Sequence, residues 1–293
     1  MDAAHYINTL ETTAPRAAKP YDYDFAVLDL ANSDKLLEEI YAGMTNEPIP
    51  WWSLFEGTSW QSEWANGPVL VDLRNAMNFR AQLSSRLESS PQGILFKSDI
   101  PVDELRQHLS HWLTESNPGF EQLLRFHEPR MFAPLLCILA AQRRRKLLSV
   151  GAHWWWHDTH SWRQAIPEED ANNMEIDLEQ ILVSQLELQS SELYWLAGEA
   201  SGYATYYADA LPETESPDCW VFDTLHTAKK AGFANAELME RWLRLAIQHG
   251  EDFYLTEPVH TAFSNEELPT TDRLVAMESL MEGVMESGYA NNL

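Results

Sequence analysis

The sequence has little cysteine, little positive charge and no long apolar run. Only Cys137 and Cys219 occur among its 293 residues, and two cysteines supply neither a disulfide framework nor a four-thiolate metal site. Its 20 Lys and Arg residues are outnumbered by 45 Asp and Glu residues, which gives a formal net charge of −25. A nucleic acid or an anionic membrane is therefore disfavoured as a partner, because both bind basic surfaces.

Segments that would direct the chain to or through a membrane are also missing. Residues 1–20 contain Glu11 and Arg16 and lack the apolar stretch of a secretory signal. The longest apolar run, residues 131–141, is interrupted by Pro134 and is too short to cross a bilayer. We expect a soluble, cytoplasmic protein with a globular core, since 45% of its residues are hydrophobic.

Motifs of common catalytic machinery are absent as well. No GxGxxG or P-loop pattern follows an expected strand, so nothing indicates a nucleotide cofactor. No GxSxG elbow occurs, and neither cysteine has the basic surroundings of an activated thiol. We therefore expect no cofactor and no nucleophilic catalysis.

Strand and helix patterns alternate through the first half of the chain. Short apolar runs predict six strands, at residues 23–30, 50–55, 67–73, 93–97, 123–126 and 150–156. Because helical spacing lies between most of them, we predict an α/β lobe over residues 23–166, with a mixed or mostly parallel sheet and flanking helices. Residues 1–22 are expected to be a poorly ordered lead-in.

The pattern changes near residue 166, where strand signals fade and helical stripes begin. We predict an acidic all-α lobe over residues 167–293, with residues 167–173 as the linker. Asn235 and Gly250 are the expected cap and stop of one of its helices. No Lys or Arg occurs between Arg163 and Lys229, and the role of this acidic run is left open.

Residues 123–136 combine an expected strand, a charged corner and a helix. Leu124 and Phe126 fit one face of a strand, and Pro129 suits the first turn of a helix. The corner is interpreted as structural: Glu128 is expected to accept backbone N–H groups and to pair with Arg125 or Arg130. The helix is expected to run to Arg143–Lys146, whose charges complement the helix dipole or contact the acidic lobe.

Two enzymatic alternatives compete with a structural reading. His153 and His157 are four residues apart, and Asp158 or His160 supplies a third ligand for an open zinc site if this segment is a helix. The three tryptophans between the histidines favour a strand, which would separate them. A glycosidase with a carboxylate pair is the second alternative, but so acidic a sequence selects no pair.

Aromatic and methionine side chains are the candidates for partner binding. The sequence has 12 tryptophans, which belong in a core, an interface or both. Trp51, Trp52, Trp154 and Trp156 are the candidate contact residues. Met277 and Met281 share a helical face, and flexible thioethers suit surfaces that accept varied apolar partners.

Five motifs in a fixed order resemble a known family. They are Tyr23–Asp29, Leu54–Thr58, Gly67–Leu73, Gly93–Ser98 and Leu124–Arg130. Together they resemble the effector-adaptor chaperones of type VI secretion (the Tap or Tec adaptors, long labelled a domain of unknown function). That family usually has a Tyr and then Asp-Pro-Arg at the last motif; here His127 and Glu128 replace the Tyr and the Asp.

The resemblance implies an adaptor without catalysis, in the cytoplasm of a Gram-negative bacterium. Such proteins bind the N-terminal segment of a toxic effector and pass it to the VgrG spike protein. The resemblance also marks family-signature positions, which are Gly57, Thr58, Arg125, Phe126, Glu128, Pro129 and Arg130. The metal-dependent or glycan-acting enzyme remains the alternative.

Overall fold

The computed structural model describes residues 2–32, 35–115, 123–167 and 182–290. The chain divides into two compact units, Asn8–Trp195 and Met1–Ile7 with Leu196–Leu293. The division falls within helix α7 (Gln185–Tyr206). The predicted linker at residues 167–173 lies, except for Pro167, outside the described residues.

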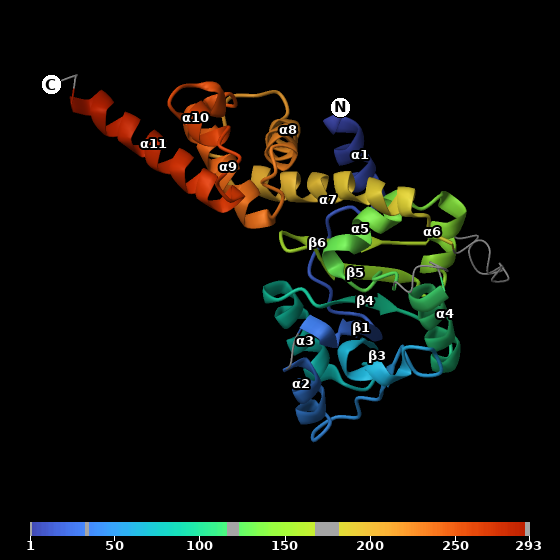
Figure 1. The fold of residues 1–293 in the computed structure, drawn as a ribbon. Helices are drawn as coiled ribbons and strands as arrows, with labels where there is room; N and C mark the ends of the chain where they lie inside the picture. Colours follow the sequence, from blue (N-terminus) through green and yellow to red (C-terminus); the bar gives the residue numbers. More distant parts are fainter. Residues whose placement is uncertain (1, 33–34, 116–122, 168–181, 291–293) are drawn as a thin grey trace. The chain divides into compact units, whose positions relative to one another are not determined.

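A six-stranded sheet forms the centre of the first unit (Figure 1). Its strands stand in the order β2-β3-β1-β4-β5-β6, and every neighbouring pair is antiparallel. The strands are β1 (Phe25–Asp29), β2 (Trp51–Ser53), β3 (Pro68–Asp72), β4 (Gly93–Lys97), β5 (His153–His157) and β6 (Trp162–Ala165). The α/β class of this region is confirmed, whereas a mixed or mostly parallel sheet was wrong.

The connections explain how the chain suggests a parallel sheet and yet forms an antiparallel one. β1 and β2 are both antiparallel to β3, which lies between them, so β1 and β2 run in the same direction. β3 and β4 likewise share a direction, with β1 between them. The connections that contain α2 and α3 therefore join strands of one direction, as in a βαβ unit, but each skips one position that an antiparallel strand fills.

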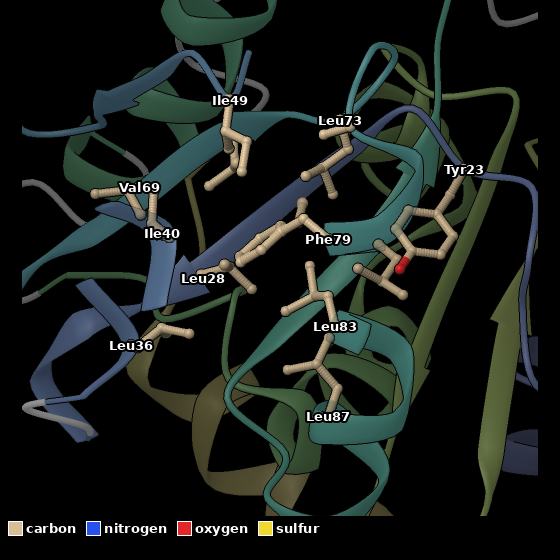
Figure 2. Close-up of a cluster of buried hydrophobic side chains, with 14 of the residues drawn as sticks. Tyr23, Leu28, Leu36, Ile40, Ile49, Val69, Leu73, Phe79, Leu83 and Leu87 are labelled. Atoms are coloured by element: carbon tan, nitrogen blue, oxygen red, sulfur yellow. The ribbon is translucent and has the colours of Figure 1, made fainter. Parts of the chain in front are cut away.

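Helices α2 (Leu36–Gly43) and α3 (Met77–Ser89) cover one face of the sheet. Figure 2 shows Leu36 and Ile40 with Phe79, Leu83 and Leu87 against the strand residues of this face. β1 and β3 are buried at all five of their positions, because helices cover both faces of the sheet. Their continuous apolar sequences follow from this burial.

Helix α5 (Pro129–Ile138) packs on the opposite face. Its Phe132 ring lies 5.9 Å from the Trp154 ring and 4.8 Å from the Trp156 ring. Trp154 in turn stacks on Phe96 of β4 at 4.4 Å. Helix α4 (Val102–Glu115) adds a stripe of buried residues, including Leu105 and Leu109, to the same unit.

Two expectations about this unit need correction. Residues 123–125 form no strand, and Phe126 and His127 form a turn. α5 ends at Ile138 and a separate helix α6 (Ala141–Leu148) follows, so the basic residues do not end the helix that starts at the corner. Arg143 instead bonds to Glu187 at the start of α7, which realises the acidic contact that the sequence left open.

The lead-in is ordered rather than poorly ordered. Helix α1 (Ala3–Thr13) buries Ile7 and Leu10. Beyond it, the Ala17 N–H donates to the Trp162 carbonyl at 2.8 Å, and the Gln164 N–H donates to the Pro15 carbonyl at 3.0 Å. This segment therefore pairs with β6 and covers that edge of the sheet.

The second unit is mostly helical, as predicted for the C-terminal region. It contains α8 (Pro217–Lys230), α9 (Ala236–His249), α10 (Val259–Phe263) and α11 (Thr270–Ala290). Asn235 caps α9 through a bond from the Leu238 N–H (2.8 Å), and Gly250 ends it at φ +91°, which confirms both expected boundaries. In the described parts of both units, no helix combines the length and apolarity needed to cross a membrane.

Candidate functional site

The signature corner is built around a carboxylate that comes from another part of the chain. Asp29, the last residue of β1, is 2% exposed. Its Oδ2 accepts from Arg125 Nη2 at 2.8 Å and lies 3.6 Å from His127 Nε2. Its Oδ1 accepts from the Ala31 N–H at 3.0 Å. The corner therefore fixes residues 125–127 to the end of the central strand.

The electrostatics of Asp29 favour its charged form. Burial raises the pKa of Asp29, but bonding and attraction from His127, the Ala31 N–H and the Arg125 charge outweigh burial. The net result is a pKa below the ordinary value. A carboxylate held in this way is stabilised as an ion, so its chemistry is that of a structural anchor rather than of a general acid.

Glu128 plays a smaller part than expected. It precedes α5, but its side chain makes no capping bond, and the Met131 and Phe132 N–H groups bond to its carbonyl oxygen instead. Its carboxylate pairs with Arg130 at 3.1 Å and lies 3.8 Å from Arg125 Nε. The predicted pairing of Glu128 with an arginine is thus present, whereas the predicted acceptance of backbone N–H groups by its side chain was wrong.

The other two corner residues of the signature serve the fold. Phe126 is fully buried and meets the His127 ring edge to face, at 5.9 Å and 89°. Pro129 is buried in the first turn of α5, where its missing N–H has no helical partner to lose. These positions connect the turn at residues 126–127 to the helix.

The signature residues Gly57 and Thr58 lie at a surface hollow of about 400 Å³. Gly57 has φ +81°, a conformation that glycine adopts at little cost. Thr58 Oγ1 donates to the Phe55 carbonyl at 2.7 Å and accepts from the Trp60 N–H at 3.1 Å. The hollow is lined by Ser53, Glu56, Gly57, Thr58, Asp103, Arg106, Gln107, Ser110, His111 and Glu115.

Three carboxylates give this space, called the acidic hollow below, its charge. Arg106 bonds to Glu56 at 2.7 Å and lies 3.7 Å from Asp103. His111 Nδ1 lies 3.2 Å from Glu115. Carboxylates therefore outnumber the guanidinium, so the charged side chains of the hollow favour positive charge over negative charge.

The predicted metal ligands are not brought together. His153 and His157 stand at opposite ends of β5, roughly 13 Å apart at the rise of a strand. His153 bonds to Gln164 at 2.9 Å, and Asp158 is held by Arg163 and by the N–H groups of the following turn. Across the described ranges, no group of three or more His, Cys, Asp or Glu residues is arranged to hold a metal ion.

The candidate partner-binding residues separate into buried and accessible ones. Trp154, Trp156 and Met277 have no exposed area, and Met281 is 8% exposed. The structure thus gives these four side chains packing positions. Trp51 and Trp52 are half-buried, and they are joined by residues that the sequence reasoning missed: Trp64 is 41% exposed and Tyr41 is 50% exposed.

The comparisons with known proteins give one match. A family model described as "Domain of unknown function (DUF4123)" matches residues 25–146. No curated protein and no solved structure matches. Residues 25–146 are therefore similar to the DUF4123 family over this range, which confirms the family resemblance drawn from the motif order. The matched range includes the corner, the acidic hollow and both half-buried tryptophans of β2.

Proposed function

We propose that this protein is a non-catalytic adaptor that binds the N-terminal segment of a toxic effector and loads it onto the VgrG spike of a type VI secretion system. It acts in the bacterial cytoplasm, before export. The observation that carries the proposal is the match of residues 25–146 to the DUF4123 family model. The matched range contains the five motifs on which the adaptor resemblance rests, apart from the first two residues of the first motif.

The use of the signature residues supports this proposal. Arg125 anchors the corner to buried Asp29, while Phe126 and Pro129 pack in the core. Residues that fix a scaffold in this way define a family by its fold rather than by a shared reaction. The thiol of Cys137 fits the same picture, because burial raises its pKa to about 12 and keeps it protonated.

Co-purification tests the proposal directly. The tagged protein is expressed with the VgrG protein and the toxin encoded beside it, and bound proteins are identified by mass spectrometry. We expect the toxin to be retained through its N-terminal segment, and a toxin truncated at that segment to be lost. The proposal fails if neither the intact toxin nor VgrG is retained.

The enzyme alternative has its own measurement. A zinc enzyme that uses His153, His157 and Asp158 would contain stoichiometric metal after purification, and the content would fall in a His153→Ala variant. Metal analysis of the wild-type protein and of His153→Ala distinguishes a zinc enzyme from the adaptor. We expect the same metal content in both proteins, because the three side chains contact Gln164, Trp162 and Arg163 instead.

A further inference from the structure

The two edges of the sheet differ in whether anything pairs with them. Residues 15–17 bond to β6 and cover one edge. β2 forms the other edge, and in the described part of the chain no strand pairs with its outer side. An uncovered edge presents N–H and C=O groups to which another extended chain can bond.

The hydrogen-bond alternation identifies which groups of β2 face outwards. The Asp72 N–H bonds to the Pro50 carbonyl at 2.8 Å, and the Leu54 N–H bonds to the Pro68 carbonyl at 3.0 Å. In an antiparallel ladder every second residue bonds to the same neighbour, so Trp52 faces β3. The N–H groups of Trp51 and Ser53 and the carbonyl of Trp51 therefore point away from the sheet.

An aromatic surface lies beside this edge. The Trp51 ring stacks on Trp64 with centroids 6.1 Å apart, and it meets Tyr41 edge to face at 6.1 Å. Trp51 is half-buried, whereas about half of Tyr41 and two fifths of Trp64 are exposed. Such a surface binds apolar side chains, and its ring faces also attract cations.

The acidic hollow begins where β2 ends. Ser53, the last residue of the strand, lines it together with Glu56, Asp103 and Glu115. Nδ1 of His111 faces Glu115, and its Nε2 is buried without a partner among the described residues. The carboxylates around it accept hydrogen bonds from a cationic side chain.

We propose that a short extended peptide segment adds to the free edge of β2 and places a Lys or Arg side chain in the acidic hollow. Main-chain bonds to Trp51 and Ser53 hold the segment, and apolar side chains pack on Trp51, Tyr41 and Trp64. The charge of the hollow selects a basic residue over an acidic one. The identity of the occupant rests on the proposed function, under which the segment belongs to the effector.

A proline substitution tests the edge. Ser53→Pro removes an outward N–H and places a ring on the edge, whereas Ser53→Ala keeps the N–H and serves as the matched control, because both variants lose the Oγ that accepts from the Phe55 N–H. We expect Ser53→Pro to bind the co-purified effector segment at least about fivefold more weakly than Ser53→Ala. Equal affinities would overturn the edge proposal and leave the adaptor function standing.

A charge substitution tests the hollow. Asp103→Asn with Glu115→Gln should weaken binding about threefold or more and reduce its sensitivity to salt. The exposed pair Glu266→Gln with Glu267→Gln removes the same charge elsewhere and should leave binding unchanged. Equal effects of the two double variants would show that only overall charge matters, and would overturn the role of the hollow.

A defined probe separates this inference from the proposed function. If the wild-type protein retains neither effector nor VgrG, the adaptor proposal fails, but the edge proposal can still be tested. Two labelled peptides of alternating Val and Thr, one ending in Arg and one in Glu, are then the probes. Preferential binding of the Arg peptide, abolished by Ser53→Pro, supports the proposal. Equal or absent binding of the two peptides overturns it.

Misfolding of Ser53→Pro and dimerisation of the wild-type protein are two further outcomes that bear on the edge proposal. If Ser53→Pro fails to fold, amide exchange of the wild-type protein replaces it: the added segment should protect the Trp51 and Ser53 N–H groups, and unchanged exchange overturns the proposal. If the wild-type protein is a dimer that Ser53→Pro converts to a monomer, the edge binds a second copy of the chain, and the proposed peptide is wrong.

Discussion

At the scale of single residues, Asp29 distinguishes the two arginines of the corner. Arg125 bonds to this carboxylate, which is 2% exposed, whereas Arg130 bonds to the more accessible Glu128. Removing one partner of a buried ion leaves an unsatisfied charge, while surface pairs contribute little. The stability of the corner should therefore depend on Arg125 more than on Arg130.

Arg125→Ala should lower the free energy of unfolding by about 2 kcal/mol, and Arg130→Ala, the matched control, by less than about 1 kcal/mol. Urea unfolding monitored by tryptophan fluorescence measures both. Effector binding should follow the same order, so Arg130→Ala should retain most of it. Equal losses from the two substitutions would show that His127 and the Ala31 N–H hold Asp29 without Arg125.

His108 of α4 gives a pH dependence that can be assigned to one side chain. Burial lowers its pKa to about 4, and its Nε2 lies 3.2 Å from the Leu147 carbonyl of α6. An unfolded histidine takes up a proton near pH 6.5. Between these values only the unfolded chain is protonated, so the contribution of neutral His108 is full above about pH 6.5 and is lost as the pH falls towards 4.

The expected loss is about 3 kcal/mol over this range. In His108→Gln, which keeps a donor for the Leu147 carbonyl, the free energy of unfolding should fall less steeply with decreasing pH than in the wild-type protein. Exposed His5→Gln is the control and should reproduce the wild-type slope. Urea unfolding at a series of pH values measures the slopes, and identical slopes for all three proteins would exclude this role of His108.

At the scale of secondary structure, the pairing of β1 with β4 depends on a glycine. Gly93 stands opposite Leu28, and a Cβ at this position would lie 2.3 Å from the Val27 carbonyl oxygen. Because that oxygen belongs to the backbone of the central strand, relief requires the two strands to separate. The small residue is therefore needed for close approach, not for its backbone conformation.

Gly93→Ala should destabilise the protein by about 2 kcal/mol. Gly283→Ala in α11 meets no atom within 4 Å and should stabilise its helix slightly. Thermal unfolding of the two variants measures the contrast. An unchanged melting temperature for Gly93→Ala would mean that the sheet accommodates the methyl group by a shift of β4.

The same strands show how far the sequence predicts the fold. β1 to β5 lie at or near expected positions, because their apolar runs are bounded by charged, Gly or Pro residues. Residues 123–126 show the period of a strand, yet the Phe126 N–H bonds to the Leu124 carbonyl within a local turn. Local alternation does not reveal whether a pairing neighbour exists, and this segment has none among the described strands.

The candidate site was predictable only in part, for a related reason. The sequence indicated that Arg125 and Arg130 take part in a structural corner, but the buried partner of Arg125 stands 96 positions earlier in the chain. Periodicity carries no information on such a distant pair. One local signal pointed to Asp29 as a buried partner. Asp29 and Asp72 each end a run of buried apolar residues, where a charged side chain needs a partner.

At the scale of the whole molecule, negative charge opposes compactness. The formal charge of −25 includes a stretch from Arg163 to Lys229 that has no Lys or Arg between its ends. Repulsion among these carboxylates weakens with salt, since the screening length is about 10 Å at 0.1 M. The acidic surface should therefore make the folded chain more stable as ionic strength rises.

The melting temperature should rise by about 2–4 °C from low to physiological sodium chloride, which corresponds to about 1 kcal/mol in a chain of this size. Differential scanning calorimetry measures the shift, with sucrose at matched osmolality as the control for effects other than screening. A fall in melting temperature would show that ion pairs, such as Arg163 with Glu11, outweigh the repulsion.

The pairing of residues 15–17 with β6 has a consequence during synthesis. The segment that covers one edge of the sheet leaves the ribosome first, but the strand that it covers, Trp162–Ala165, is made long afterwards. β1 likewise cannot pair until its two neighbours, β3 and β4, have been synthesised. The nascent chain therefore carries unpaired apolar segments until residue 165 has emerged, and such segments are prone to aggregate before the fold is complete.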